Sequence, residues 1–93
     1  MTEVRKLEEH KYAQCHVCAD YGESGRLLGV TLVSYVTPVV RIAYGSDGKR
    51  YVSCKGLYSA TTRRQIGWFL KEYAPDLCYY DVKGIVGDGF VEM

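Results

Sequence analysis

Four cysteines are the residues of this 93-residue chain with the most evident chemical potential. Two of them lie in the segment Cys15-His16-Val17-Cys18, whose spacing allows a turn to bring both thiolates onto one Zn²⁺ ion. A structural zinc site takes four nitrogen or sulfur ligands, and Cys54 and Cys78 could complete the set. Because the chain has no second Cys-x-x-Cys pair, we expect free thiols, no bound metal and no other cofactor, with a zinc site as the alternative.

Catalytic motifs are missing from the sequence. The chain has only two histidines, His10 and His16, and it lacks a Gly-x-Ser-x-Gly turn, a phosphate-binding glycine loop and paired metal-binding carboxylates. We therefore predict that the protein is not an enzyme and that it acts by binding.

A polar and basic cluster, Thr61-Thr62-Arg63-Arg64, begins the segment with the strongest helical pattern. The N-terminus of a helix offers unpaired N–H groups and the positive end of the helix dipole. Together with hydroxyl and guanidinium groups, these would suit a phosphate or an acidic side chain of a partner. The alternative interpretation is that both arginines are simply hydrated surface residues.

Trp68 is the only tryptophan, and it falls on the polar side of the same helix. At about 100° per residue it projects roughly 200° from Ile66, among Arg64, Gln65, Lys71 and Glu72. Either the N-terminal segment or the C-terminal tail covers it, or it anchors a partner or a second copy. We favour the interface, because Trp is the side chain most enriched in binding hot spots.

Nine tyrosines are the other conspicuous feature, and four of them fall on predicted strands or strand ends: Tyr44, Tyr51, Tyr79 and Tyr80. Aromatic side chains near cations can stack nucleic-acid bases, but tyrosine also suits half-buried strands and protein interfaces. The formal net charge of +1 favours a protein partner over a polyanion. The partner-binding residues that we predict are Trp68, Arg63, Arg64, Lys71, Tyr44 and Tyr51.

The elements that position these residues follow from the spacing of apolar residues. Residues 61–74 are predicted to be a helix, because Ile66, Phe69, Leu70 and Tyr73 form one apolar stripe. A capping box of Thr62 and Gln65, or Ser59 as the competing cap, begins this helix, and Pro75 stops it. Strands are predicted over 27–35, 39–44, 49–54 and 77–82, with the turn Gly45-Ser46-Asp47-Gly48 between the second and the third.

The two ends of the chain give weaker patterns. Residues 1–14 suggest a short helix, residues 15–25 a loop or hairpin end, and residues 83–93 a short edge strand or a frayed tail. The length and the order of elements predict one α+β domain over 1–93, with a small antiparallel sheet of about four strands and one main helix packed on one face.

Two stretches, Ser34-Tyr35-Val36-Thr37-Pro38-Val39 and Tyr58-Ser59-Ala60-Thr61-Thr62, resemble a family of small uncharacterised domains that is common in bacteriophage genomes. The pattern is Ser-Tyr-x-Thr-x-Val followed by Tyr-Ser-x-Thr-Thr, and the resemblance covers about residues 31–73. It implies a protein of a phage or another mobile element.

Small phage proteins without a catalytic site are often binders of host proteins. The resemblance therefore implies an inhibitor or modulator of a host protein, for instance in evasion of host defence in the manner of anti-CRISPR proteins. A small nucleic-acid-binding protein that uses the sheet tyrosines and the basic helix start is the alternative. The charged N-terminus and the lack of an apolar run of about 20 residues lead us to expect a protein of the bacterial host cytoplasm without a membrane span.

Overall fold

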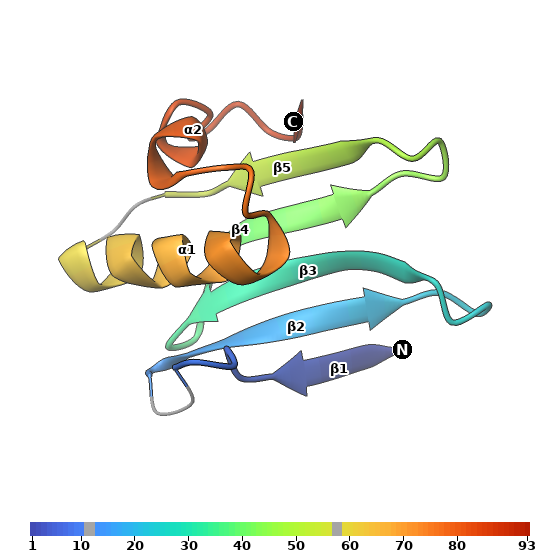
Figure 1. The fold of residues 1–93 in the computed structure, drawn as a ribbon, viewed down its shortest axis with the longest axis horizontal. Helices are drawn as coiled ribbons and strands as arrows, with labels where there is room; N and C mark the ends of the chain where they lie inside the picture. The colour runs from blue at the N-terminus through green and yellow to red at the C-terminus, as the bar shows by residue number, and fades with distance from the viewer. Residues whose placement is uncertain (11–12, 57–58) are drawn as a thin grey trace.

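One antiparallel sheet and two helices make up the protein, in a computed structural model that describes residues 1–10, 13–56 and 59–93 (Figure 1). The strands follow one another across the sheet in sequence order, and helix α1 (Ala60–Tyr73) lies over one face. A short helix α2 (Tyr79–Lys83) lies beside the last long strand. The strands are β1 (Thr2–Arg5), β2 (Cys15–Tyr21), β3 (Leu27–Ser34), β4 (Thr37–Tyr44), β5 (Arg50–Cys54) and β6 (Val91–Glu92).

The α+β class, the antiparallel sheet and the single main helix are confirmed, but the sheet has six strands rather than about four. The strands predicted over 27–35, 39–44 and 49–54 correspond to β3, β4 and β5. The strand predicted over 77–82 is wrong, because α2 occupies this segment and buries only Val82. Of the two alternatives for the C-terminal tail, the edge strand is confirmed, since Val91 pairs with Val52.

The short helix predicted over 1–14 is wrong, because β1 lies there. Of the two alternatives for 15–25, the loop is wrong for Cys15–Tyr21, which form β2, whereas residues 22–26 are the end of the β2–β3 hairpin. In β2 the buried residues Cys15, Val17 and Ala19 alternate with side chains that remain partly exposed. This is the period of a strand covered on one face. Because few of these residues are typical strand formers, the alternation is hard to recognise in the sequence.

Helix α1 begins at Ser59, the competing cap, whose Oγ accepts a hydrogen bond of 3.3 Å from the N–H of Thr62. The predicted Thr62–Gln65 capping box is therefore wrong, and both side chains are buried residues of α1 instead. Gln65 is 1% exposed, and its Oε1 has no hydrogen-bond partner among the described residues. The helix ends at Tyr73, before Ala74 and Pro75. Within the described part of the chain, no helix combines the length and apolarity that crossing a membrane requires.

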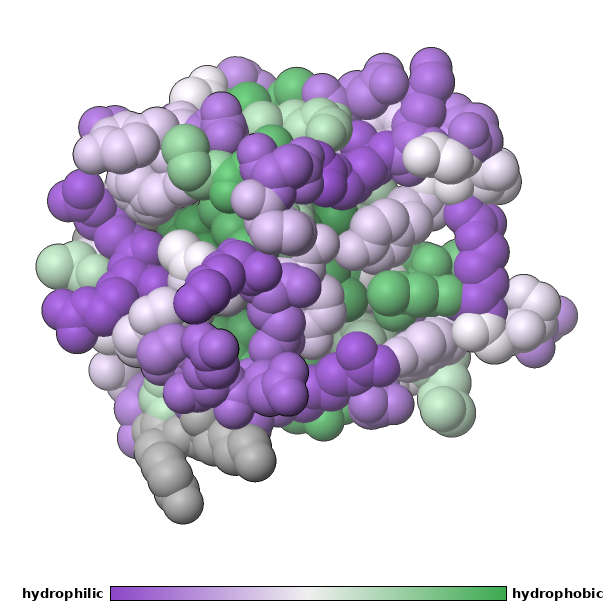
Figure 2. All heavy atoms as spheres, in the orientation of Figure 1, coloured by the Kyte–Doolittle hydropathy of each residue, from purple (hydrophilic) through white to green (hydrophobic). Residues whose placement is uncertain are grey.

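The hydrophobic core lies between α1 and the face of the sheet that the helix covers. Cross-strand neighbours on that face include Val17 opposite Leu32 and Val30 opposite Ile42, all fully buried. Figure 2 shows the outer surface on the side of the molecule where α1 covers the sheet, and hydrophilic residues there surround smaller apolar areas. The core residues outside the sheet come from the segment after β1, from both helices and from the residue that follows α1: Leu7, Ile66, Phe69, Leu70, Ala74 and Val82.

The opposite face of the sheet carries a polar network that crosses four strands. Thr2 Oγ1 donates to Asp20 (2.7 Å), and Arg41 Nη1 contacts both Asp20 Oδ2 (2.7 Å) and Thr31 Oγ1 (2.8 Å). The hydrogen bond from Thr2 and the adjacent guanidinium of Arg41 hold the pKa of Asp20 below its usual range. The ionised carboxylate therefore stabilises the fold above about pH 4, and this contribution is lost as the pH falls further.

Gly29 makes room for this network, because Arg41 lies against it. A Cβ at Gly29 would lie 2.7 Å from Arg41 Nη2 and 2.9 Å from the carbonyl oxygen of Ile42, which belongs to the backbone and cannot move aside freely. We expect Gly29→Ala to lower the free energy of unfolding by about 1–3 kcal/mol, as overpacking does. Urea denaturation monitored by circular dichroism measures the change.

Gly67→Ala is the matched control, because a Cβ at this position in α1 meets no atom within 4 Å. Alanine also favours a helix over glycine, so this variant should be more stable than the wild type by up to about 1 kcal/mol. A Gly29→Ala protein as stable as the wild type would contradict the close approach of Arg41.

Candidate binding site

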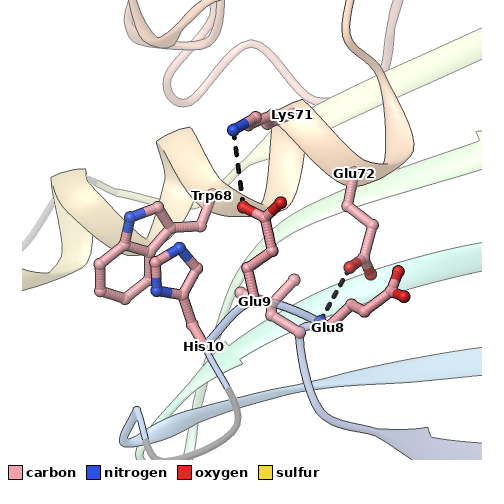
Figure 3. Close-up of a pocket in the computed structure, with 7 residues that line it drawn as sticks. Glu8, Glu9, His10, Trp68, Lys71 and Glu72 are labelled. Carbon is pink, nitrogen blue, oxygen red and sulfur yellow. Dashed lines mark hydrogen bonds and ion pairs between the residues drawn. The ribbon is translucent and has the colours of Figure 1, made fainter.

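Trp68 lies on the flank of α1, beside the buried stripe of the helix, and it is partly buried against the core. Its indole stacks on the imidazole of His10, with the ring centroids 3.8 Å apart and the planes 12° from parallel (Figure 3). His10 comes from the segment between β1 and β2. The N-terminal segment therefore covers one face of Trp68, which is the alternative that the sequence analysis did not favour. That Trp68 also binds a partner stays a prediction.

The segment that carries His10 is held against α1 at three further points. Leu7 is 1% exposed and belongs to the core. The N–H of Glu8 donates to Glu72 Oε1 at 2.9 Å, and Lys71 Nζ lies 3.5 Å from Glu9 Oε2 (Figure 3). The apolar anchor and the backbone hydrogen bond fix the segment, whereas the Lys71–Glu9 ion pair is exposed and contributes little to stability.

A hollow of about 280 Å³ opens between this segment and α1. It is smaller than the ~300–1,000 Å³ pockets that hold small-molecule ligands, so a single long side chain of another protein fits it better. Among the ionisable groups of its lining, the carboxylates outnumber the one ammonium group, which favours a cationic guest. The lining residues are Leu7, Glu8, Glu9, His10, Trp68, Lys71 and Glu72.

The basic residues predicted to bind a partner do not form a single patch. Lys71 lines the hollow, and Arg64 lies one turn before Trp68 along α1, on the same side of the helix. The guanidinium of Arg63 instead lies over the ring of Tyr79, 4.9 Å from its centroid. An anion-binding role for Arg63 and Arg64 therefore stays a prediction, and Arg63 would have to share its guanidinium with Tyr79.

The tyrosines do not form the shared stacking surface that the nucleic-acid interpretation needs. Tyr44 packs against the core on the helix-covered side, where burial raises the pKa of its hydroxyl. Tyr51 lies on the opposite face, because it pairs with Ala43, the neighbour of Tyr44 in β4. Tyr79 and Tyr80 lie on α2, edge to face with each other, and not on a strand.

The four cysteines are also kept apart. Cys15 and Cys18 lie on opposite faces of β2, because they are an odd number of residues apart in one strand. Cys54 is buried in β5, and Cys78 is exposed at the start of α2. The alternative zinc set of Cys15, Cys18, Cys54 and Cys78 is thus not brought together, and within 1–10, 13–56 and 59–93 no group of three His, Cys, Asp or Glu residues is placed to hold a metal ion.

Sequence reasoning found Trp68 and Lys71 but missed the residues that complete the hollow: Leu7, Glu8, Glu9, His10 and Glu72. Their contacts join segments about 60 residues apart, which no local pattern reveals. The feature of the sequence that pointed to this site was Trp68, because a large aromatic side chain on the polar side of a helix is expected to be covered by another segment or by a partner.

Thiol reactivity follows from the positions of the cysteines. Burial raises the pKa of the Cys15 and Cys54 thiols and shields them from solvent, whereas Cys78 is exposed. In the folded protein at pH 8 we expect iodoacetamide to label Cys78 first and Cys18 second, with Cys15 and Cys54 protected until unfolding. Peptide mass spectrometry over a time course measures the four rates. Labelling of Cys15 or Cys54 at the rate of Cys78 would show that the core is not packed in this way.

Comparison with known proteins finds one family model that spans most of the chain. A family model described as a family of unknown function, DUF8033, matches residues 6–81. The match includes all residues that line the hollow, together with β2 to β5 and α1. No curated protein and no solved structure matches the chain.

Proposed function

We propose that this chain, which belongs to the DUF8033 family of unknown function, is a non-enzymatic protein-binding module. The hollow beside Trp68 is the binding site in this proposal. The observation that carries the proposal is the combination of a stacked Trp68–His10 pair with the carboxylates of Glu8, Glu9 and Glu72 around one small hollow.

The aromatic pair supports binding because it presents apolar area in a fixed orientation. His10 stacks on one face of the indole, and the rest of Trp68 contacts the core, so few rotamers are lost when a partner arrives. Aromatic side chains that are rigid before binding are the typical anchors of protein interfaces.

The charges of the hollow favour a cationic side chain from the partner. Glu9 and Lys71 are largely exposed and can rearrange, so the Glu9 carboxylate can exchange Lys71 for a new cation. Arginine fits best, because its planar guanidinium binds carboxylates in pairs and also stacks on aromatic rings. A partner with an exposed arginine flanked by apolar residues would satisfy both features of the hollow.

The biological setting of the proposal is a phage or mobile-element protein that inhibits or modulates a host protein in the bacterial cytoplasm. The support for it is the resemblance around Ser34–Val39 and residues 59–62; Tyr58 of the second motif lies outside the described residues. Nucleic-acid binding finds less support, because Tyr44 and Tyr51 lie on opposite faces of the sheet.

The first test is capture of partners from bacterial lysate on the immobilised protein, with and without nuclease, followed by calorimetry on the partner that is identified. We expect Trp68→Ala to weaken binding by at least ~2 kcal/mol, about 30-fold in Kd, as loss of an anchor does. We expect Glu9→Lys to weaken it by about tenfold, because it removes a carboxylate and adds a repelling charge.

Two controls make this test specific. Tyr80→Ala removes an exposed aromatic side chain of α2 that does not line the hollow, and its affinity should match that of the wild type. Glu9→Lys changes an exposed residue and should leave the thermal midpoint almost unchanged, so weaker binding by this variant cannot be ascribed to unfolding. Wild-type affinity in both Trp68→Ala and Glu9→Lys would refute the proposal, as would captured material that nuclease releases completely.

A further inference from the structure

Strand β1 forms one edge of the sheet, and among the described residues it pairs with β2 on one side (Figure 1). Met1 and Tyr21 exchange two backbone hydrogen bonds, of 2.8 and 2.7 Å. Because inward and outward backbone groups alternate along an antiparallel strand, Glu3 and Arg5 bond to β2, and the N–H and C=O of Val4 point outward. The outer edge of β1 therefore offers donors and acceptors for another strand.

We propose that this edge pairs with β1 of a second copy of the chain, antiparallel about a two-fold axis at Val4. In this arrangement Val4 of one protomer lies opposite Val4 of its partner, and each N–H donates to the carbonyl oxygen of the other. The two sheets then continue into one, and the same surface is used on both sides, as a two-fold interface requires.

Charge complementarity and the extent of pairing select this register, because centring on Thr2 would leave Val4 and Arg5 of each β1 without a partner residue in the other β1. Outward-facing backbone groups of one strand must lie opposite outward-facing groups of the other. The two-fold axis therefore passes through a residue of β1 and not between two residues. Centring on Glu3 or on Arg5 would place two like charges directly opposite each other, which destabilises a strand pair. Centring on Val4 places Glu3 opposite Arg5 twice, at the closely spaced non-hydrogen-bonded positions where side chains interact most strongly.

The side chains of β1 that would make these contacts are exposed or partly exposed, although Arg5 also donates a hydrogen bond to the Tyr21 hydroxyl. Val4 is 67% exposed, so its pairing with a second Val4 would cover apolar surface. Arg5 already forms an ion pair with Glu3 of its own chain at 2.6 Å, and both side chains remain partly exposed. In the dimer each Arg5 would lie between two Glu3 carboxylates. Because β1 has four residues, the contact is small, and the dimer should be weak and concentration-dependent.

Sedimentation equilibrium on the untagged chain, at protein concentrations from about 10 μM to about 1 mM, tests the proposal. This range detects dimers with a Kd of up to about 1 mM. We expect dimer in the wild type to increase with concentration, and Glu3→Arg or Arg5→Glu alone to raise the dimer Kd at least about tenfold. The double variant Glu3→Arg/Arg5→Glu restores unlike charges at both positions, so it should return to within about threefold of the wild type.

Two controls distinguish pairing through β1 from a general effect of net charge and from association through the hollow. Asp88→Arg makes the same change in net charge as Glu3→Arg at an exposed residue between α2 and β6, near the other edge of the sheet, and Trp68→Ala removes the aromatic anchor of the hollow; both should dimerise as the wild type does. A wild type that is monomeric at about 1 mM would overturn the proposal. So would a double variant no better than the single ones, or loss of the dimer in Trp68→Ala.

Discussion

The packing of α1 onto one face of the sheet is the interaction on which the rest of the structure depends. Ile66, Phe69 and Leu70 are fully buried there, and burial of each such side chain contributes about 1.5–3 kcal/mol. The described residues form one long helix, which covers one face of the sheet and leaves the other to polar contacts such as that of Asp20 with Arg41. Once these apolar residues face the sheet, helical geometry places Trp68 on the flank of the helix, at the margin of the core.

The position of Trp68 in turn explains the candidate site. The indole on this flank is covered by His10, and Leu7, which is buried in the core, anchors the segment that carries His10. Glu72, one turn after Trp68, accepts the hydrogen bond from Glu8 that keeps the segment along the helix. The hollow thus results from the same packing that stabilises the fold, and its carboxylates are brought together by tertiary contacts rather than by a sequence motif.

The sequence predicted those parts of the fold whose local pattern agrees with their final environment. Helix α1 and strands β3 to β5 have clear apolar periods, and tertiary packing preserves them. Strand β2 was missed because its covered face uses Cys15 and Ala19 rather than large strand formers, and 77–82 was mistaken for a strand although it turns into α2. Of the candidate site, Trp68 and Lys71 could be predicted from the helical wheel. His10 and Glu72 could not, because their roles depend on contacts between distant segments.

The most direct test of this account is nuclear Overhauser spectroscopy on the monomeric, isotopically labelled protein, using the single tryptophan and the two histidines as probes. The account predicts cross-peaks between the imidazole protons of His10 and the ring protons of Trp68, with the His10 protons shifted upfield by the indole, whereas His16 in β2 shows neither effect. His10 resonances at unstructured-peptide positions, without cross-peaks to Trp68, would contradict the docked segment and with it the hollow.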